Sequence, residues 1–264
     1  MKSLLVHSII FTLIFILCSN QSANNYDAVA TSDSIIVGGG CEGCEAIYES
    51  PVAFEKLNWI DTLPDYFEAG PKLMVSGIVY KADGKTPAAN VVLYVYHTDQ
   101  TGHYTQKGNE TGWGKRHGYI RDWMKTNMKG EYKFYTLRPA PYPNRSLPAH
   151  IHVTLKEPDF NEYYIDEFVF DDDPLLTTAE RKKAENRGGS GIMTIENKNG
   201  IQVAERNIYL GLHIPDYPQT NNFKYQSGLS VGENLPAFDP NIFQDLIKEK
   251  QNAPCALMAW VKEF

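Results

Sequence analysis

The chain has 264 residues, a formal net charge of −7 and an aromatic content of 12%, with 16 tyrosines. This negative charge argues against a protein that binds nucleic acid or anionic membranes, because both need a basic surface. A Tyr-, Gly- and Pro-rich sequence with few long helical patterns favours an all-β fold. We expect a β-sandwich or open barrel with long loops, an N-terminal arm and a C-terminal tail.

The N-terminus has the pattern of an export signal. Residues 1–23 contain a lysine, then an apolar run of secretory length, then polar residues. We therefore predict a signal peptide and an exported protein, located in the periplasm, outside the cell or at the cell envelope. Cys18 stands where the apolar run ends, so lipid modification at Cys18 and ordinary cleavage within residues 19–23 are both open. Such a lipid anchor is the only membrane association we expect.

Residues 24–68 are polar and Gly-rich and are interpreted as the arm, and residues 69–216 as the main domain, followed by the tail 217–264. Alternating β-branched and aromatic residues between turn signals predict several short strands in the main domain. These are Leu73–Tyr80, Asn90–His97, a hairpin over Met124–Leu137, Ala149–Leu155, Tyr163–Phe170, Gly191–Glu196 and Ile208–Ile214.

Three other segments of the main domain are not predicted as strands. A charged segment, Thr178–Asn186, predicts a short helix capped by Thr177 or Thr178. Asp99–Trp123 is polar and Gly-rich and predicts a long loop, of a length that is usually functional or disordered. Arg138–Leu147 is too rich in proline for regular structure.

Cys41 and Cys44 form a single CxxC pattern inside the arm. A structural zinc site would need a second cysteine pair or suitably spaced histidines, and the sequence has neither. In an exported protein, we interpret the pair as a small loop disulfide rather than as a catalytic pair. Cys255 is then left unpaired or reactive.

His150 and His152 are the sharpest local signal. Alternate residues of a strand point to one face, so the two imidazoles are expected side by side. Imidazole is the commonest ligand for iron, copper and zinc. The alternative is a pair of hydrogen-bonded histidines at a sheet edge, without metal.

Two tyrosines strengthen the metal interpretation. Tyr142 lies in the Pro-rich segment Pro139–Pro143, which can hold a phenol in place, and Tyr104 follows shortly after a predicted strand. A hard trivalent cation prefers anionic oxygen ligands, and its charge would remove the proton of a coordinated phenol. Two phenolates and two imidazoles would suit Fe(III).

Here the sequence resembles the intradiol ring-cleavage dioxygenases, which include the catechol and protocatechuate dioxygenases. The resemblance covers about residues 70–215, and its motifs are Val75–Tyr80, Val91–Tyr96, Gly102–Tyr104, Thr126–Phe134, Arg138–Pro143 and Pro148–His152. It implies Fe(III) as cofactor, with four ligands: Tyr104, Tyr142, His150 and His152. It also implies that an aromatic diol and O2 are the substrates and that a muconate-type diacid is the product. The tyrosinate at the position of Tyr142 helps to take up a substrate proton.

The chain departs from the family pattern at one position. Well-studied members carry an arginine three residues before the first ligand histidine, where this sequence has Leu147. Arg145 is predicted to supply the missing charge as a catalytic residue, with Arg138, Arg121 and Arg116 as other candidates. The departure at Leu147 concerns turnover of the diol and leaves the four predicted iron ligands unchanged.

Two other functions stay open at this point. One is a non-catalytic, transthyretin-like β-sandwich that binds a ligand, and the other is a protein that binds copper or zinc through His150 and His152. Mixed tyrosine and histidine ligation favours ferric iron over both.

Overall fold

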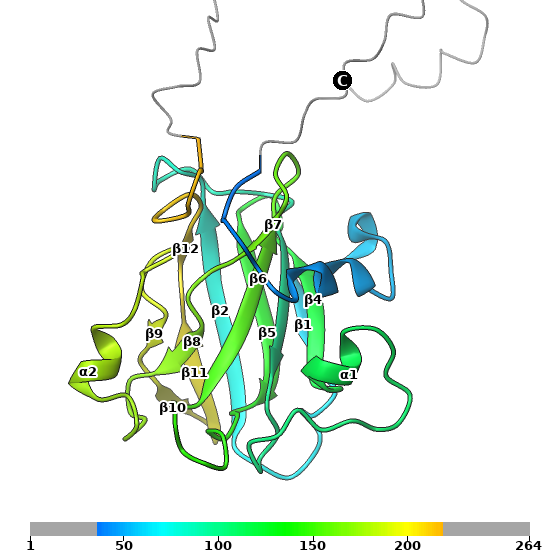
Figure 1. The fold of residues 1–264 in the computed structure, drawn as a ribbon, viewed down its shortest axis with the longest axis vertical. Helices are drawn as coiled ribbons and strands as arrows, with labels where there is room; N and C mark the ends of the chain where they lie inside the picture. Colours follow the sequence, from blue (N-terminus) through cyan, green and yellow to red (C-terminus); the bar gives the residue numbers. More distant parts are fainter. Residues whose placement is uncertain (1–35, 219–264) are drawn as a thin grey trace, which may run out of the picture.

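The computed structural model describes residues 36–218, and the fold is mostly β (Figure 1). The predicted signal peptide, Cys18, Cys255 and nearly all of the predicted tail lie outside the described residues. Within residues 36–218, none of the helices has the length and apolar character needed to cross a membrane.

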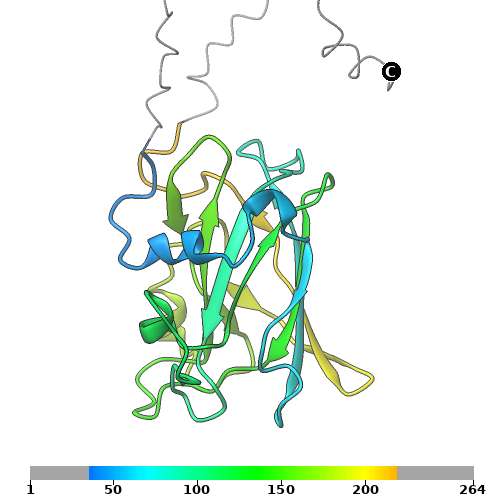
Figure 2. The same ribbon diagram turned by 90° about the vertical axis from the view of Figure 1, so that its right-hand side faces the viewer.

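Two six-stranded mixed sheets pack into a sandwich, as the sequence predicts, and Figure 2 shows the two layers edge-on. The first sheet has the order β1-β5-β2-β11-β10, with β12 also on β2. Its strands are β1 (Ile60–Thr62), β2 (Lys72–Tyr80), β5 (Glu131–Leu137), β10 (Glu196–Lys198), β11 (Ile201–Glu205) and β12 (Ile208–Tyr209). The second has the order β4-β3-β6-β8-β9, with β7 also on β6. It consists of β3 (Val92–His97), β4 (Arg121–Lys125), β6 (His150–Lys156), β7 (Glu162–Tyr164), β8 (Phe168–Phe170) and β9 (Ile192–Met193).

The main core lies between the sheets. Residues along β2 alternate between buried and half-buried, as expected of a strand with one face on the core. Val75 of β2 joins Leu93 and Val95 of β3, and Ile151 and Val153 of β6, in one buried apolar cluster. Since Ile151 and Val153 face inward, residues 150, 152 and 154 of β6 face away from the core.

A second, smaller core covers the outer face of the second sheet. The short helix η1 (Cys44–Glu49) contributes Ala46 and Ile47, which pack on Tyr94 and Trp123. Another 3-10 turn, η2 (Phe54–Lys56), follows it. The segment before β1 thus lies across this sheet, in front of it in Figure 1.

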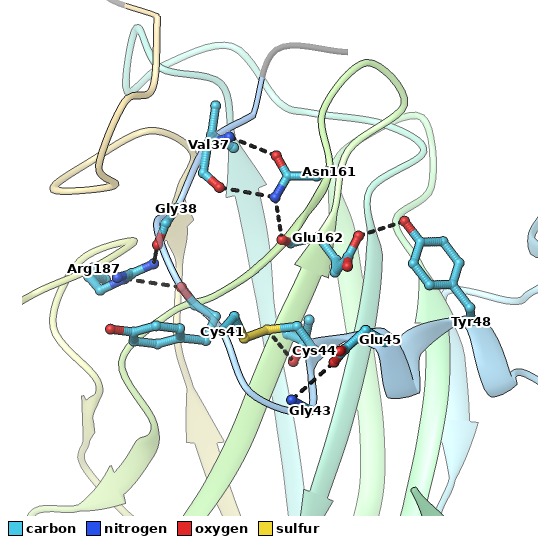
Figure 3. Close-up of a disulfide and its surroundings, with 12 residues drawn as sticks. Val37, Gly38, Cys41, Gly43, Cys44, Glu45, Tyr48, Asn161, Glu162 and Arg187 are labelled. Atoms are coloured by element: carbon cyan, nitrogen blue, oxygen red, sulfur yellow. Dashed lines mark hydrogen bonds between the residues drawn. A yellow bond between two sulfur atoms is a disulfide. The ribbon is translucent and has the colours of Figure 1, made fainter. Parts of the chain in front are cut away.

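Figure 3 shows how the N-terminal segment is fixed to the sandwich. The side chain of Asn161 donates to the carbonyl of Val37 and accepts from its amide, and the Tyr48 hydroxyl donates to Glu162. Cys41 and Cys44 form the predicted disulfide.

Several predicted elements differ from the observed ones. The predicted hairpin over Met124–Leu137 is wrong: β4 pairs with β3 and β5 pairs with β2, so the turn at residues 127–130 connects the two sheets. The predicted strand Tyr163–Phe170 is split into β7 and β8, and the helix α2 (Thr178–Arg181) is shorter than expected, with Thr177 as its N-cap. The predicted long loop contains a helical turn, α1 (Gly114–His117), and the start of β4, and β1 lies within the predicted arm.

Candidate metal centre

His150 and His152 lie on the outward face of β6, side by side as predicted. Their ring centroids are 4.7 Å apart and the rings are nearly perpendicular. Strand alternation explains this placement, because the intervening Ile151 occupies the apolar core. The pair therefore lies on the outer face of the sandwich.

The loop after β5 brings Tyr142 to this face. Ala140 donates its amide to the Asp99 carbonyl, and Thr98 donates its hydroxyl to the Ala140 carbonyl. Gly102 packs so closely that a Cβ there would lie 2.2 Å from the Pro141 carbonyl oxygen. The two tyrosine-bearing loops are thus in direct contact.

The four predicted ligand atoms converge on one point. The hydroxyl oxygens of Tyr104 and Tyr142 are 2.7 Å apart, and the Tyr104 oxygen is 2.8 Å from Nε2 of His152. The Tyr142 oxygen is 3.2 Å from Nε2 of His150. Residues from three separate segments, up to 48 positions apart in the sequence, are therefore gathered in one cluster.

Hydrogen bonding prepares His150 as a ligand. Its Nδ1 lies 2.8 Å from the Pro148 carbonyl oxygen, to which an Nδ1–H donates. That bond selects the tautomer whose Nε2 carries the lone pair, and this lone pair points to Tyr142. Burial, and then the neighbouring His150, His117 and His97, keep the pKa of His152 well below its usual value, so the His152 imidazole is neutral.

The protonation of Tyr104 depends on a cation. Burial raises the pKa of the Tyr104 phenol above its ordinary value, and the hydrogen bond with Tyr142 adds to this effect. The polypeptide alone therefore keeps the phenol protonated, and a bound cation is needed to form a phenolate.

The donor set fits a metal ion of the size of iron. Ligand atoms with metal bonds of about 2.0–2.2 Å, at angles near 90°, stand about 3 Å from one another. The observed separations of 2.7, 2.8 and 3.2 Å match this spacing. Residues 36–218 contain no group of three or more His, Cys, Asp or Glu side chains suited to a metal. A copper or zinc site made by His150 and His152 alone leaves the two tyrosine oxygens unexplained.

A cavity of about 350 Å³ opens beside His150. Leu147 lines it and is 41% exposed, so an apolar side chain stands where the resemblance predicts a cation. The lining cations are Arg181 and Lys183, paired with Asp171 and Glu180 respectively. Arg145 lies outside this lining: it is exposed and occupies a left-handed turn, with φ of 53°.

The sequence did not indicate three further residues near the ligands. Tyr96 is the cross-strand partner of His152 and stacks on its ring. His117 is buried, and burial and then Arg121 and Arg116 lower its pKa to about 4. Glu167 Oε1 is 3.7 Å from Nδ1 of His152. Strand register could have indicated Tyr96, because its pairing with His152 follows once β3 and β6 are aligned.

The fold and the four donors together define a β-sandwich protein with a tyrosine- and histidine-lined metal-site candidate. Residues 60–206 match the family described as Dioxygenase, which is more than half of the chain. The chain belongs to the intradiol dioxygenase family, a class of oxidoreductases. Members of this family typically use non-haem Fe(III) and act on aromatic diols and O2.

Individual relatives agree with this membership. The protocatechuate 3,4-dioxygenase beta chain of Burkholderia cepacia is 28% identical over 113 residues, which are 40% of this chain and 48% of that protein. The chain thus matches about half the length of this relative.

Two solved structures are similar. The dioxygenase domain of a dioxygenase and carbohydrate-binding protein fusion from Streptomyces sp. SirexAA-E is 21% identical, with a TM-score of 0.45, over 56% of this chain and 85% of that one. The 3-chlorocatechol 1,2-dioxygenase of Rhodococcus opacus 1CP is 19% identical, with a TM-score of 0.44, over 56% and 62%.

Proposed function

We propose that this chain binds ferric iron and uses it with O2 to cleave the ring of a catechol-type aromatic diol. Cleavage between the two hydroxyl-bearing carbons gives a muconate-type diacid. The iron ligands are Tyr104, Tyr142, His150 and His152. The observation that carries the proposal is the convergence of two phenol oxygens and two imidazole nitrogens within 2.7–3.2 Å of their neighbours.

When bound by these four residues, ferric iron would supply positive charge and open coordination positions for a diol substrate. The protein holds the ligand atoms and handles the protons. The hydrogen bond from His150 to the Pro148 carbonyl fixes the orientation of that imidazole. By the resemblance to the family, Tyr142 would take up a substrate proton at its oxygen, and it lies half-buried on a loop beside His150.

The cavity beside His150 is the proposed place of the aromatic ring. Leu147, Pro148 and Val169 give it apolar walls that suit an aromatic ring. The catalytic role of Arg145 stays a prediction. Export also stays a prediction, because the signal peptide lies outside the described residues.

Colour tests the iron site. We expect purified protein reconstituted with ferric iron to be red-brown, because tyrosinate-to-iron charge transfer absorbs visible light. Tyr142→Phe should abolish the colour change that catechol causes in the parent protein, whereas Tyr80→Phe, remote on β2, should leave it intact. A colourless reconstituted protein contradicts the proposal, and a parent-like response of Tyr142→Phe contradicts the ligand assignment.

Turnover is tested separately by oxygen uptake with catechol, protocatechuate and hydroxyquinol. Uptake on at least one of them, with a ring-opened diacid as product, supports the dioxygenase reaction. A coloured protein without uptake on any of the three contradicts the reaction as proposed for simple diols and leaves the iron site standing.

A further inference from the structure

A stack of aromatic rings ends at the ligand His152. The ring of Tyr96 lies 4.5 Å from that of His152, at an interplanar angle of 16°. On its other side, Tyr96 is 3.8 Å from His117, and these two rings are nearly parallel, at 5°. His152 is therefore the end member of a three-ring stack.

The outer end of this stack is fixed. Nδ1 of His117 and the hydroxyl of Tyr94 form a hydrogen bond of 2.8 Å, and both groups are buried. The ring of Trp113 lies 5.3 Å from that of His117. Gly43 closes the remaining side, since a Cβ there would meet Nε2 of His117 at 3.1 Å. His117 thus has little room to move.

The two ligand histidines are held in different ways. Nδ1 of His150 is anchored by the Pro148 carbonyl at 2.8 Å. Nδ1 of His152 faces Glu167 at 3.7 Å, which is too long for a hydrogen bond. Apart from the contact of its Nε2 with the Tyr104 hydroxyl at 2.8 Å, the orientation of the His152 ring depends on what packs against its face, and Tyr96 is stacked there.

We propose that Tyr96 and His117 are positioning residues of the metal centre, which fix the plane of His152 so that its Nε2 points at the other three donors. This inference rests on the proposed function, because it assigns a role toward the same iron. Metal sites depend on the groups that orient their ligands, and losing one such group typically weakens metal binding about 10–100-fold.

The N-terminal segment takes part in this arrangement. Gly43 lies between Cys41 and Cys44, and Figure 3 shows the turn that their disulfide closes. A cavity of about 250 Å³ is lined by both cysteines, by Tyr96 and by His152. The disulfide turn therefore adjoins both ends of the stack.

The test compares two replacements of Tyr96. Tyr96→Phe keeps the ring and Tyr96→Leu removes it, while Tyr80→Leu removes a ring stacked on Tyr209 on a different sheet. The ferric dissociation constant is measured by competition with a chelator, together with the charge-transfer spectrum of the iron-loaded protein. We expect about 10–100-fold weaker binding and a shifted band for Tyr96→Leu only, with Tyr96→Phe close to the parent.

The outcomes separate the two proposals. If the parent protein does not bind ferric iron, the proposed function fails. If the parent binds iron and Tyr96→Leu binds it equally tightly with an unchanged band, the positioning role is refuted and the function stands. Should Tyr96→Leu unfold, His117→Leu replaces it in the same comparison with Tyr80→Leu, and parent-like iron binding by His117→Leu refutes the role equally.

Discussion

Gly102 is not a predicted ligand, but its replacement with alanine should disturb the candidate metal centre. The φ of Gly102 is +81°, and a Cβ there would lie 2.2 Å from the carbonyl oxygen of Pro141. Real Cβ atoms essentially never approach within 3.0 Å, so the loop that carries Tyr142 must retreat by about 0.8 Å from the loop that carries Tyr104. Metal and catalytic sites tolerate displacements of only about 0.5 Å.

Two free-energy terms add up in this variant. An L-residue in the left-handed region costs about 1–2 kcal/mol. Overpacking against backbone costs a further ~1–3 kcal/mol. For a domain of this size, about 1 kcal/mol lowers the melting temperature by about 2–4 °C. We therefore expect Gly102→Ala to melt roughly 4–20 °C below the parent and to bind ferric iron at least ~10-fold more weakly.

Gly200→Ala is the matched control. Gly200 also has a φ of +81°, but a Cβ there would meet nothing within 4 Å. It carries the backbone strain without the collision. Thermal unfolding by circular dichroism and chelator competition for iron are measured on both variants. If Gly102→Ala binds iron as tightly as Gly200→Ala, then the contact between the two loops does not position the tyrosines, and the reasoning is wrong.

Two further predictions concern stability. Burial, and then the charge of Asp61, raise the pKa of Asp122 to about 7, so the folded state holds a proton that the unfolded state has lost between about pH 4 and pH 7. Stability is therefore lost as the pH rises through this window, and Asp122→Asn should stabilise the protein by about 2 kcal/mol at pH 8, after allowance for solvent screening, and hardly at all at pH 4. Equal effects in melts at pH 4 and pH 8 would contradict this assignment. The double replacement Cys41→Ser and Cys44→Ser removes a very short covalent loop. It should therefore lower the free energy of unfolding, measured by denaturant titration, by only about 2 kcal/mol. A loss far above that value would mean that the disulfide does more than close the loop.

Local pattern was enough to predict the strands that carry the site. Period-two alternation indicated β2, β3 and β6 within a few residues, and the prolines around Tyr142 correctly indicated an irregular loop. The structure also brings the four residues of the ligand prediction together. Their positions could be predicted because each residue lies beside a strong local signal, either a strand of alternating residues or a run of prolines.

Pairing between strands could not be predicted in the same way. Residues 127–130 form a turn that looks like a hairpin turn, but β4 and β5 separate into different sheets. Each strand pairs along its length with an earlier strand, β4 with β3 and β5 with β2, and such pairing is a non-local effect. Arg145 shows a similar limit of sequence-based prediction. It is close to His150 in sequence, but this closeness does not predict the exposed, left-handed turn in which Arg145 lies.

The four predicted donors lie on the outer face of the sandwich, so the segments that cover this face, including the N-terminal one, affect their exposure to solvent. A side chain on that face of β6 would ordinarily meet solvent, since only the opposite face packs on the core. Yet His150 on this face is 8% exposed, and His117 of α1, which lies over the same face, is 6% exposed. The cover comes from the surrounding loops and from the disulfide-closed turn, whose Gly43 adjoins His117. Shielding from water strengthens every electrostatic interaction at a metal centre. The disulfide-closed turn, in a segment that the sequence marks only as polar and Gly-rich, therefore covers His117 and shares a cavity with His152.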